Sequence, residues 1–306
     1  MRIPAGETVF PETLAKTMFG RISERVRQSS KRLCLAGVLA SDDVGSHQYA
    51  VWTQETCQAI GVDFCLVQIS PWNVATYIKA LNTNPCIHGI IVYYPIFGDE
   101  RDDDIKTLVS HTKDVEGLNR WPLRNSPEVT EARGQPCLGP TLVPCTPKAV
   151  EAILQWLAIH DPNLPTRDQL NKWEICIINR SDVVGLPLAQ MLAGQGARVY
   201  SVDVAGVQLF YRVNHPWGSG RVERMHSDLT LREAVRASRV IISAVPHPAF
   251  KVETKWLQVG AICVNVSSAK NFEPDVLDIA SKFVPRIGNV TIASLLENLL
   301  LCARQG

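Results

Sequence analysis

Short apolar runs alternate with helical stretches along most of this 306-residue chain. In the first half, apolar runs at 32–40 and 87–98 flank a stretch with helical spacing at 46–61, which ends at a glycine suited to a helix C-terminus. Strands that alternate with helices are typical of a parallel sheet. The pattern restarts after Pro147, a residue favoured in the first turn of a helix. The sequence therefore predicts the α/β fold class, with two domains joined near residue 148.

The remaining elements follow from the same spacing. We expect one helix at 11–28 and another that begins near Arg101, where acids in the first turn suit the helix dipole. In the second half we expect a strand at 174–178, a helix at 183–194, and strands at 198–202, 239–245 and 261–266. Residues 205–237 are expected to be irregular and polar with one helix-like segment, and a last helix is expected at 291–305. The second half is therefore predicted to be a nucleotide-binding unit of Rossmann type.

Composition excludes several classes of protein. The 31 basic and 30 acidic residues give a net charge of +1, and no charge run is long enough for a nucleic-acid tail or a basic membrane patch. No run of about 18 apolar residues is present either. The nine cysteines are scattered without a C-x-x-C pair, which argues against a disulfide framework and a zinc site. We therefore expect no nucleic-acid, membrane or metal partner, and a reduced compartment, most simply a cytoplasmic location.

The turn after the strand at 174–178 has most features of a phosphate-binding turn. A dinucleotide-binding turn usually has the pattern G-x-G-x-x-G, but here Asn179 occupies the first glycine position. Gly185 remains and allows close packing of the helix on the strand. Ser181 is a good helix cap, and Arg180 can pair with a phosphate. We therefore expect the pyrophosphate of a dinucleotide at this turn.

Asp203 ends the next strand, about 20 residues beyond the turn. An acid at this position suits the ribose hydroxyls of NAD and repels the additional phosphate of NADP. For a single aspartate, a polar strand end is the simpler interpretation, but the order strand, turn, helix, strand and acid favours NAD as the cofactor. Other cofactor contacts are expected beside these elements and after the later strands, at Arg180, Ser181, Gly185, Pro187, Val204, Val245, Pro246, Val266, Ser267 and Ser268.

Five segments resemble one family and keep its order along the chain. They are SHQYAVWTQ (46–54), GIIVYYP (89–95), KDVEG (113–117), PCTP (144–147) and NRSDVVGLP (179–187). Together they resemble the methylenetetrahydrofolate dehydrogenase/cyclohydrolase family, and within it the monofunctional, NAD-dependent fungal type. The resemblance implies an N-terminal α/β substrate domain, a C-terminal Rossmann-type NAD-binding domain and a cleft between them. The last helix then completes the folate-binding domain, which comprises residues 1–148 and 291–306 and leaves 149–290 for NAD.

The resemblance also assigns the residues on the folate side. Tyr49 matches a family tyrosine, and Thr53 stands one helical turn later, where the family has the lysine associated with the cyclohydrolase step. Tyr93 replaces a family glutamine, and Glu116 replaces the aspartate that the family uses against the pterin ring. The loop at 285–290 is shorter than the glycine-rich loop of the family. Threonine has neither the charge nor the basicity of lysine, so we expect dehydrogenase activity without cyclohydrolase activity.

The candidate residues on this side fall into two groups. The catalytic candidates are Tyr49, Thr53, Glu116 and Cys145, and the substrate-binding candidates are Tyr93, Tyr94, Pro95 and Asp114. Simpler interpretations stand beside these: Tyr49 as a packed aromatic residue, Glu116 as a solvated loop acid. A thiol near a helix N-terminus has a lowered pKa, which gives Cys145 a catalytic or positioning role as the alternative to a structural one. Tyr93 either stacks on the pterin ring or fills the space of the family glutamine.

The expected reaction oxidises methylenetetrahydrofolate with NAD and gives methenyltetrahydrofolate and NADH. The methylene carbon gives a hydride to the nicotinamide, so the main task of the protein is to position the two ligands. The resemblance further implies a homodimer. Two alternatives stay open: a bifunctional dehydrogenase/cyclohydrolase in which another group replaces the lysine, and a folate- or dinucleotide-binding protein without turnover.

Overall fold

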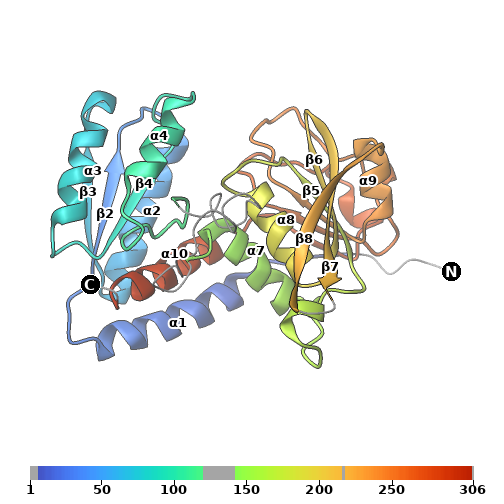
Figure 1. The fold of residues 1–306 in the computed structure, drawn as a ribbon, viewed down its shortest axis with the longest axis horizontal. Helices are drawn as coiled ribbons and strands as arrows, with labels where there is room; N and C mark the ends of the chain where they lie inside the picture. Colours follow the sequence, from blue (N-terminus) through green and yellow to red (C-terminus); the bar gives the residue numbers. More distant parts are fainter. Residues whose placement is uncertain (1–5, 120–141, 216–217, 305–306) are drawn as a thin grey trace. The chain divides into compact units, whose positions relative to one another are not determined.

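The computed structural model describes residues 6–119, 142–215 and 218–304, and the chain forms two compact units (Figure 1). Unit 1 comprises Met1–Leu14 and Thr146–Val290, and unit 2 comprises Ala15–Cys145 and Thr291–Gly306. The chain therefore passes between the units three times, after residues 14, 145 and 290. Among the described residues, no helix combines the length and the apolar character that a membrane span requires.

Unit 2 is built on a parallel sheet with the strand order β3-β2-β4. The strands of its described part are β2 (Cys34–Leu39), β3 (Asp63–Gln68) and β4 (Gly89–Tyr93). Its helical segments are α1 (Glu12–Gln28), α2 (Val44–Ile60), η1 (Pro71–Asn73), α3 (Val74–Thr83), α4 (Arg101–Leu108) and α10 (Gly288–Cys302). Apolar residues of β2, β4, α3 and α4 form one buried cluster that includes Ile90 and Val92. Leu299 of α10 meets β4 at Gly89, on the opposite face because side chains alternate along a strand.

Unit 1 contains one large sheet, ordered β1-β11-β10-β9-β5-β6-β7-β8 in the described residues. Its strands are β1 (Glu7–Thr8), β5 (Glu174–Ile178), β6 (Arg198–Asp203), β7 (Gly206–His215), β8 (Gly218–Ser227), β9 (Val240–Ser243), β10 (Ile262–Asn265) and β11 (Lys282–Val284). Its helical segments are α7 (Cys145–Trp156), η2 (Thr166–Asp168), α8 (Gly185–Gly194), α9 (Leu231–Ala237), η3 (Thr254–Trp256) and η4 (Val276–Asp278). In this order across the sheet, each pair of neighbouring strands between β1 and β6 is parallel. The direction of winding reverses at β5, which is where such sheets bind ligands.

The structure corrects the expectation for residues 205–237. Most of this stretch is the antiparallel hairpin of β7 and β8, which pairs with β6 and extends the sheet before α9 begins. The fully buried residues of β7, Val207 and Phe210, are three positions apart, so the alternation that marks a strand is not visible in the sequence. The apolar run 87–98 is also only partly a strand, because pairing ends at Tyr93.

The grouping of the first residues differs from the expected domains. Sequence analysis places residues 1–148 together, whereas Met1–Leu14 group with unit 1. The physical reason is β1, which pairs in parallel with β11 through Glu7–Lys282 and Thr8–Phe283. A strand of two residues leaves no periodic signal in a sequence.

Candidate active site

One face of α2 carries three polar residues of unit 2. Ser46, Tyr49 and Thr53 are spaced i, i+3 and i+7, so they lie on one side of the helix. The Thr53 hydroxyl donates to the Tyr49 carbonyl oxygen at 2.8 Å. The Tyr49 ring meets the ring of Tyr93 edge to face, with the centroids 6.0 Å apart. The structure therefore brings the predicted residues Tyr49, Thr53 and Tyr93 together at the carboxyl end of β4.

The hydroxyl group of Tyr93 is buried and has no hydrogen-bond partner among the described residues. Burial raises the pKa of Tyr93, and the nearby Thr53 hydroxyl, which lies outside hydrogen-bond geometry, offsets part of this effect. The phenol is therefore neutral at physiological pH. A buried hydroxyl without a partner costs about 1–3 kcal/mol, which an acceptor atom of a bound ligand would offset.

Glu116 lies beside this aromatic pair. Its half-buried carboxylate accepts a hydrogen bond from the Val92 amide at 3.2 Å. Burial and, to a smaller extent, the charge of Asp114 raise the pKa of Glu116 to about 8. A carboxyl group with this pKa changes charge near physiological pH, which is typical of a functional site rather than of a solvated loop acid.

Asp114 has a different surrounding. It is 5% exposed, and its two carboxylate oxygens accept from the Gly117 amide at 3.0 Å and the Asn119 amide at 2.7 Å. Burial raises the pKa of Asp114 to about 6, and these amides act in the opposite direction. The structure therefore gives Asp114 the task of holding the loop that carries Glu116.

Cys145 is the first residue of α7 and is 7% exposed. Its amide donates to the Glu116 carbonyl oxygen at 3.1 Å, so the two predicted residues are adjacent. Gly117, at φ 73°, allows this approach, because a Cβ there would lie 2.9 Å from the Pro144 nitrogen. The structure thus places Cys145 beside Glu116, joined to the Glu116 loop by a bond of its backbone.

The segment that follows β4 is fixed by polar contacts at both ends. The Ser46 hydroxyl lies 3.1 Å from the Tyr94 carbonyl oxygen and 3.0 Å from the Asp43 carboxylate, and it has one proton to share between them. Beyond the cis peptide Tyr94–Pro95, the buried Asp102 carboxylate accepts from the amides of Ile96, Phe97 and Gly98 at 2.9–3.2 Å. Tyr94 is half-buried and Pro95 is exposed. These contacts therefore give the two predicted substrate residues a defined backbone position.

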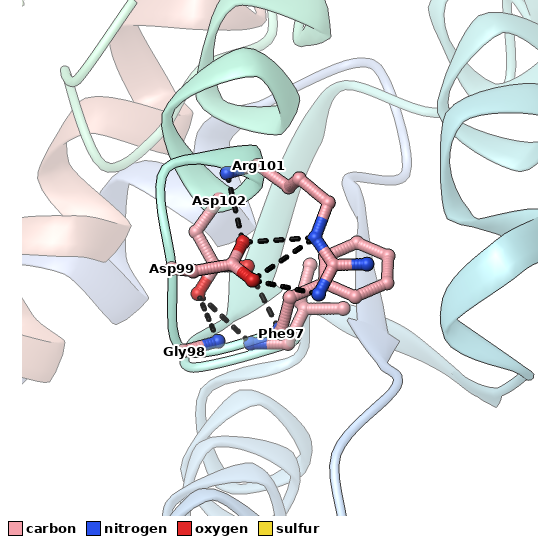
Figure 2. A network of polar contacts seen from close by, with 6 residues as sticks. Phe97, Gly98, Asp99, Arg101 and Asp102 are labelled. Carbon is pink, nitrogen blue, oxygen red and sulfur yellow. Dashed lines mark hydrogen bonds and ion pairs between the residues drawn. The ribbon is translucent and has the colours of Figure 1, made fainter.

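Figure 2 shows the contacts around Asp102 together with a neighbouring ion pair. The Arg101 guanidinium pairs with Asp99 at 2.7 Å and lies over the Phe97 ring, 4.1 Å from its centroid. Both partners of this ion pair are about half exposed, so the pair itself contributes little to stability. The three bonds to the buried Asp102 are the stronger constraint on the segment.

In unit 1, the conformation of the predicted nucleotide turn explains why asparagine can replace the first glycine of the G-x-G-x-x-G pattern. Asn179 has φ 86°, a left-handed conformation that asparagine tolerates better than most residues. Its side-chain amide donates to the Ala244 carbonyl oxygen at 2.8 Å and so links the ends of β5 and β9. The glycine that remains is sterically required, because a Cβ on Gly185 would lie 1.9 Å from the Asn179 carbonyl oxygen. Asn179 and Gly185 together therefore form the tight strand–helix turn.

Arg180 and Asp203 lie near each other at this turn. Arg180 donates to the Gly206 carbonyl oxygen at 2.9 Å, and its other terminal nitrogen, Nη1, is buried without a partner among the described residues. Burial lowers the pKa of Arg180, and the charge of Asp203 opposes this. The Asp203 carboxylate accepts from the Val204 amide at 2.6 Å, and the Val204 side chain is fully exposed. The structure therefore places three predicted cofactor residues around the β6–β7 turn.

The other predicted cofactor residues follow their strands as expected. Ser181 accepts from the Val184 amide at 3.3 Å, and Pro187 is buried in α8. Val245 and Pro246 follow β9, and Val266, Ser267 and Ser268 follow β10. Because β9 and β10 are parallel neighbours, these loops lie at the same edge of the sheet. No group of three or more His, Cys, Asp or Glu residues in the described ranges has metal-binding geometry.

Sequence reasoning missed several residues that position the candidates. They are Ser46, Asp102, Asn265, Asn271 and Asn298. Ser46 had a signal, since it lies one helical turn before Tyr49. Asp102 was visible only as one of several acids that suit the helix dipole. The three asparagines have no local signal, because their partners are distant in the sequence.

Fold and site together define the class of protein as a two-unit α/β protein with a dinucleotide-type turn. One unit groups two tyrosines with a carboxylate of raised pKa, and the other contains the doubly wound sheet with this turn. Residues 11–116 match the model of the tetrahydrofolate dehydrogenase/cyclohydrolase catalytic domain. The chain is 36% identical over 284 residues to a Dictyostelium discoideum protein named methylenetetrahydrofolate dehydrogenase [NAD(+)], covering 90% of this chain and 89% of the relative. It is 35% identical over 309 residues to a Saccharomyces cerevisiae protein of the same name, covering 98% and 96%.

A solved structure gives the same result. The NAD-dependent 5,10-methylenetetrahydrofolate dehydrogenase from Saccharomyces cerevisiae matches with a TM-score of 0.88 and 34% identity over 98% of each chain. The chain therefore belongs to the tetrahydrofolate dehydrogenase/cyclohydrolase family. This confirms the resemblance carried by the five sequence segments and the predicted α/β fold class.

Proposed function

We propose that the protein catalyses the NAD-dependent oxidation of 5,10-methylenetetrahydrofolate to 5,10-methenyltetrahydrofolate in one-carbon metabolism. The observation that carries the choice of NAD is the position of Asp203 at the nucleotide turn: it pairs with Gly206, and Arg180 donates to the Gly206 carbonyl oxygen at 2.9 Å. An acid there accepts bonds from ribose hydroxyls and repels a ribose phosphate. The names of the relatives from Dictyostelium discoideum and Saccharomyces cerevisiae, both NAD-dependent dehydrogenases, support the same conclusion.

The residues of unit 1 fit a dinucleotide. Arg180 has a buried guanidinium nitrogen, Nη1, without a partner among the described residues. This nitrogen can donate a hydrogen bond to a phosphate or ribose oxygen. Gly185 lets α8 begin directly against the turn. The Leu186 and Leu188 amides already donate to the Ser181 and Val184 carbonyl oxygens, and Pro187 has no amide proton, so within this first turn the Gly185 amide is the one left for a pyrophosphate. When bound, NAD supplies the hydride acceptor, C4 of the nicotinamide ring.

On the folate side, the residues of the chain bind and orient. In its ionised form, the Glu116 carboxylate can pair with the donor groups of the pterin ring. The Tyr93 hydroxyl offers a buried donor, and Tyr49 presents an aromatic surface beside it. The methylene carbon loses a hydride, and a nitrogen lone pair forms the new carbon–nitrogen double bond. No proton changes hands, so the step needs no general base and depends on positioning.

The test is NADH formation by the purified protein with methylenetetrahydrofolate, with NAD and NADP compared in parallel. Turnover with NAD and little with NADP is the expected result. Asp203→Ser should reduce the NAD:NADP ratio of kcat/KM at least about tenfold, since the repulsion of a ribose phosphate is lost. Preference of the wild type for NADP would disprove the role of Asp203. Tight binding of NAD without turnover would favour the non-catalytic binding protein.

We further propose that cyclohydrolase activity is absent, because Thr53 donates to the Tyr49 carbonyl and offers no cation. One observation favours the bifunctional alternative: Lys106 lies over the Tyr94 ring at 5.5 Å and acts on the Glu116 carboxyl electrostatically. Lys106 is paired with Asp103 at 2.6 Å, which argues against a catalytic role. Hydrolysis of methenyltetrahydrofolate by the wild type, lost in Lys106→Met, would establish the bifunctional enzyme.

A homodimer and a cytoplasmic location are the remaining proposals. The family resemblance supports the homodimer, and the cysteine composition supports a reduced compartment. Light scattering of the purified protein tests the first, and imaging of a tagged full-length chain tests the second.

A further inference from the structure

Two buried asparagines have no part in the reaction described above, yet both bond to the backbone of candidate site segments. Asn271 of unit 1 is 0% exposed, and Asn298 of unit 2 is 1% exposed. Buried amides of this kind are retained only when their donors and acceptors are matched. Their partners therefore show which parts of the chain they hold.

Asn271 holds the loop after β9. Its side-chain oxygen accepts from the Ser243 hydroxyl at 3.0 Å and from the Val245 amide at 3.1 Å. Its side-chain nitrogen donates to the Val245 carbonyl oxygen at 3.0 Å. Both backbone groups of Val245, a predicted cofactor residue, are thus fixed by one side chain.

Asn265 extends this network to the next two strand ends. Its side-chain oxygen accepts from the Asn271 amide at 3.1 Å. Its side-chain nitrogen donates to the Ser267 carbonyl oxygen at 2.8 Å and to the Pro285 carbonyl oxygen at 3.1 Å. Asn271 is therefore bonded by its side chain to the loop after β9, and by its backbone, through Asn265, to the loops after β10 and β11, at the edge where a dinucleotide binds in such a sheet.

Asn298 occupies a corresponding position in unit 2. From α10, its side-chain nitrogen donates to the carbonyl oxygens of Val115 and Val143, each at 2.9 Å. Val115 directly precedes Glu116, and Val143 lies two residues before Cys145. Asn298 therefore ties the two folate-side segments to each other through their backbones.

We propose that Asn271 and Asn298 are positioning residues, Asn271 for the nucleotide-side loop after β9 and Asn298 for the backbone that carries Glu116 and Cys145. The inference rests on the proposed dehydrogenase function, because it assigns each asparagine to one of the two ligands of that reaction. Small displacements of groups that position ligands reduce rates strongly. Each asparagine then affects the ligand of its own unit more than the other ligand.

The test uses full-length Asn271→Asp, Asn298→Asp, Asn271→Leu and Asn298→Leu, with KM measured for both ligands. Loss of a buried partner at these sites should raise the KM for NAD about tenfold in the Asn271 variants and the KM for methylenetetrahydrofolate about tenfold in the Asn298 variants. The other KM should stay within about twofold in each case. Ser238→Ala is the control, because it removes a buried bond, to the Ala234 carbonyl at 2.8 Å, away from both sites.

The aspartate variants separate positioning from general packing. Aspartate at 271 keeps the oxygen that accepts from Ser243 and Val245, so Asn271→Asp should retain more NAD affinity than Asn271→Leu. Aspartate at 298 keeps neither of the two donated bonds, so Asn298→Asp should lose folate affinity although its size is unchanged. If these variants do not fold, Asn271→Ser and Asn298→Ser, which leave room for water, carry the same comparison.

Equal changes in both KM values, or changes that match those of Ser238→Ala, would overturn the proposal. Calorimetric titration of each variant with NAD measures binding without turnover, so it tests the positioning role separately from the proposed function. If the wild type binds NAD but shows no turnover, the dehydrogenase proposal fails. In that case a loss of NAD affinity in the Asn271 variants alone still supports the positioning role, and an equal loss in the Asn298 variants disproves it.

Discussion

Glu116 has a carboxyl group that the fold keeps in an unfavourable environment. Its pKa is raised to about 8, first by burial and then by Asp114. The folded state therefore binds this proton more tightly than the unfolded chain does. Stability from this group is fully present below its ordinary pKa of 4.5 and is lost as the pH rises to about 8. The charge that we propose binds the pterin ring thus destabilises the free protein.

Glu116→Gln should separate these two effects. At pH 8 the variant should be more stable than the wild type, by on the order of 2 kcal/mol, because no charge is buried. Below pH 4.5 the difference should vanish, since the wild-type side chain is then neutral too. Urea unfolding at several pH values measures this. A variant that is less stable at pH 8 would show that the carboxylate is well compensated.

The same residue should determine the pH dependence of activity. If the carboxylate binds the pterin ring, kcat/KM for methylenetetrahydrofolate should rise with pH and level off above about 8. Glu116→Gln should have a lower kcat/KM without this rise. An unchanged pH profile in the variant would assign the titration to another group.

At the scale of elements, the site depends on turns whose backbones approach closely. In the nucleotide turn, α8 starts against Asn179, and only a residue without a side chain fits at the first position of the helix. In the segment after β4, the first turn of α4 supplies the Asp102 carboxylate that holds three amides. Each turn lies at the end of a strand, where parallel sheets place their ligands.

Gly185→Ala should damage the nucleotide turn. The added Cβ would lie 1.9 Å from a backbone oxygen, so the turn must move, at a cost of about 3 kcal/mol or more. NAD affinity should fall with it. The matched control is Gly194→Ala at the other end of α8, where the nearest atom is a side-chain carbon at 3.7 Å. That change should be neutral or stabilise by up to about 1 kcal/mol, and thermal unfolding distinguishes the two.

Asp102→Ala should loosen the segment that carries Tyr94 and Pro95. Three amides, one of them in a fully buried bond, lose their acceptor, so we expect a loss of about 2–3 kcal/mol in the free energy of unfolding and a higher KM for the folate. Asp104→Ala removes an exposed acid from the same helical turn and should cost less than about 1 kcal/mol. Equal losses in the two variants would mean that only the helix dipole matters.

For the whole molecule, the central strands of the large sheet could be predicted from the sequence, and the strands toward its edges could not. β5 has its predicted bounds, and β6 differs by one residue, because both contain β-branched or aromatic residues between turn residues. β1 is too short to show a periodic sequence pattern, and the buried residues of β7 do not alternate with exposed ones. In the site, Tyr49, Thr53 and Glu116 came from family resemblance. Asn271 and Asn298 could not be found, since their partners lie up to 28 and 183 residues away.

The two units should also be distinguishable in stability. Leu299→Ala removes a fully buried side chain of α10 that meets β4, and it should destabilise unit 2 by about 2–5 kcal/mol. Amide exchange should then accelerate in β2 and β4 and change little in β5. Ile241→Ala in β9 should have the opposite pattern. Uniform acceleration in both variants would mean that the chain unfolds as one cooperative body.

The three passages of the chain between the units have a consequence for synthesis. A protein leaves the ribosome from its N-terminus, and domains usually fold in that order. Here most of unit 2 is made before most of unit 1, but Thr291–Gly306, with the buried Leu299 and Asn298, is made only after Val290, the last residue of unit 1. Unit 2 therefore cannot complete its fold, and the face that α10 covers stays exposed, until Thr291–Gly306 have left the ribosome. Unit 2, most of which is translated before most of unit 1, is therefore the later of the two to finish folding.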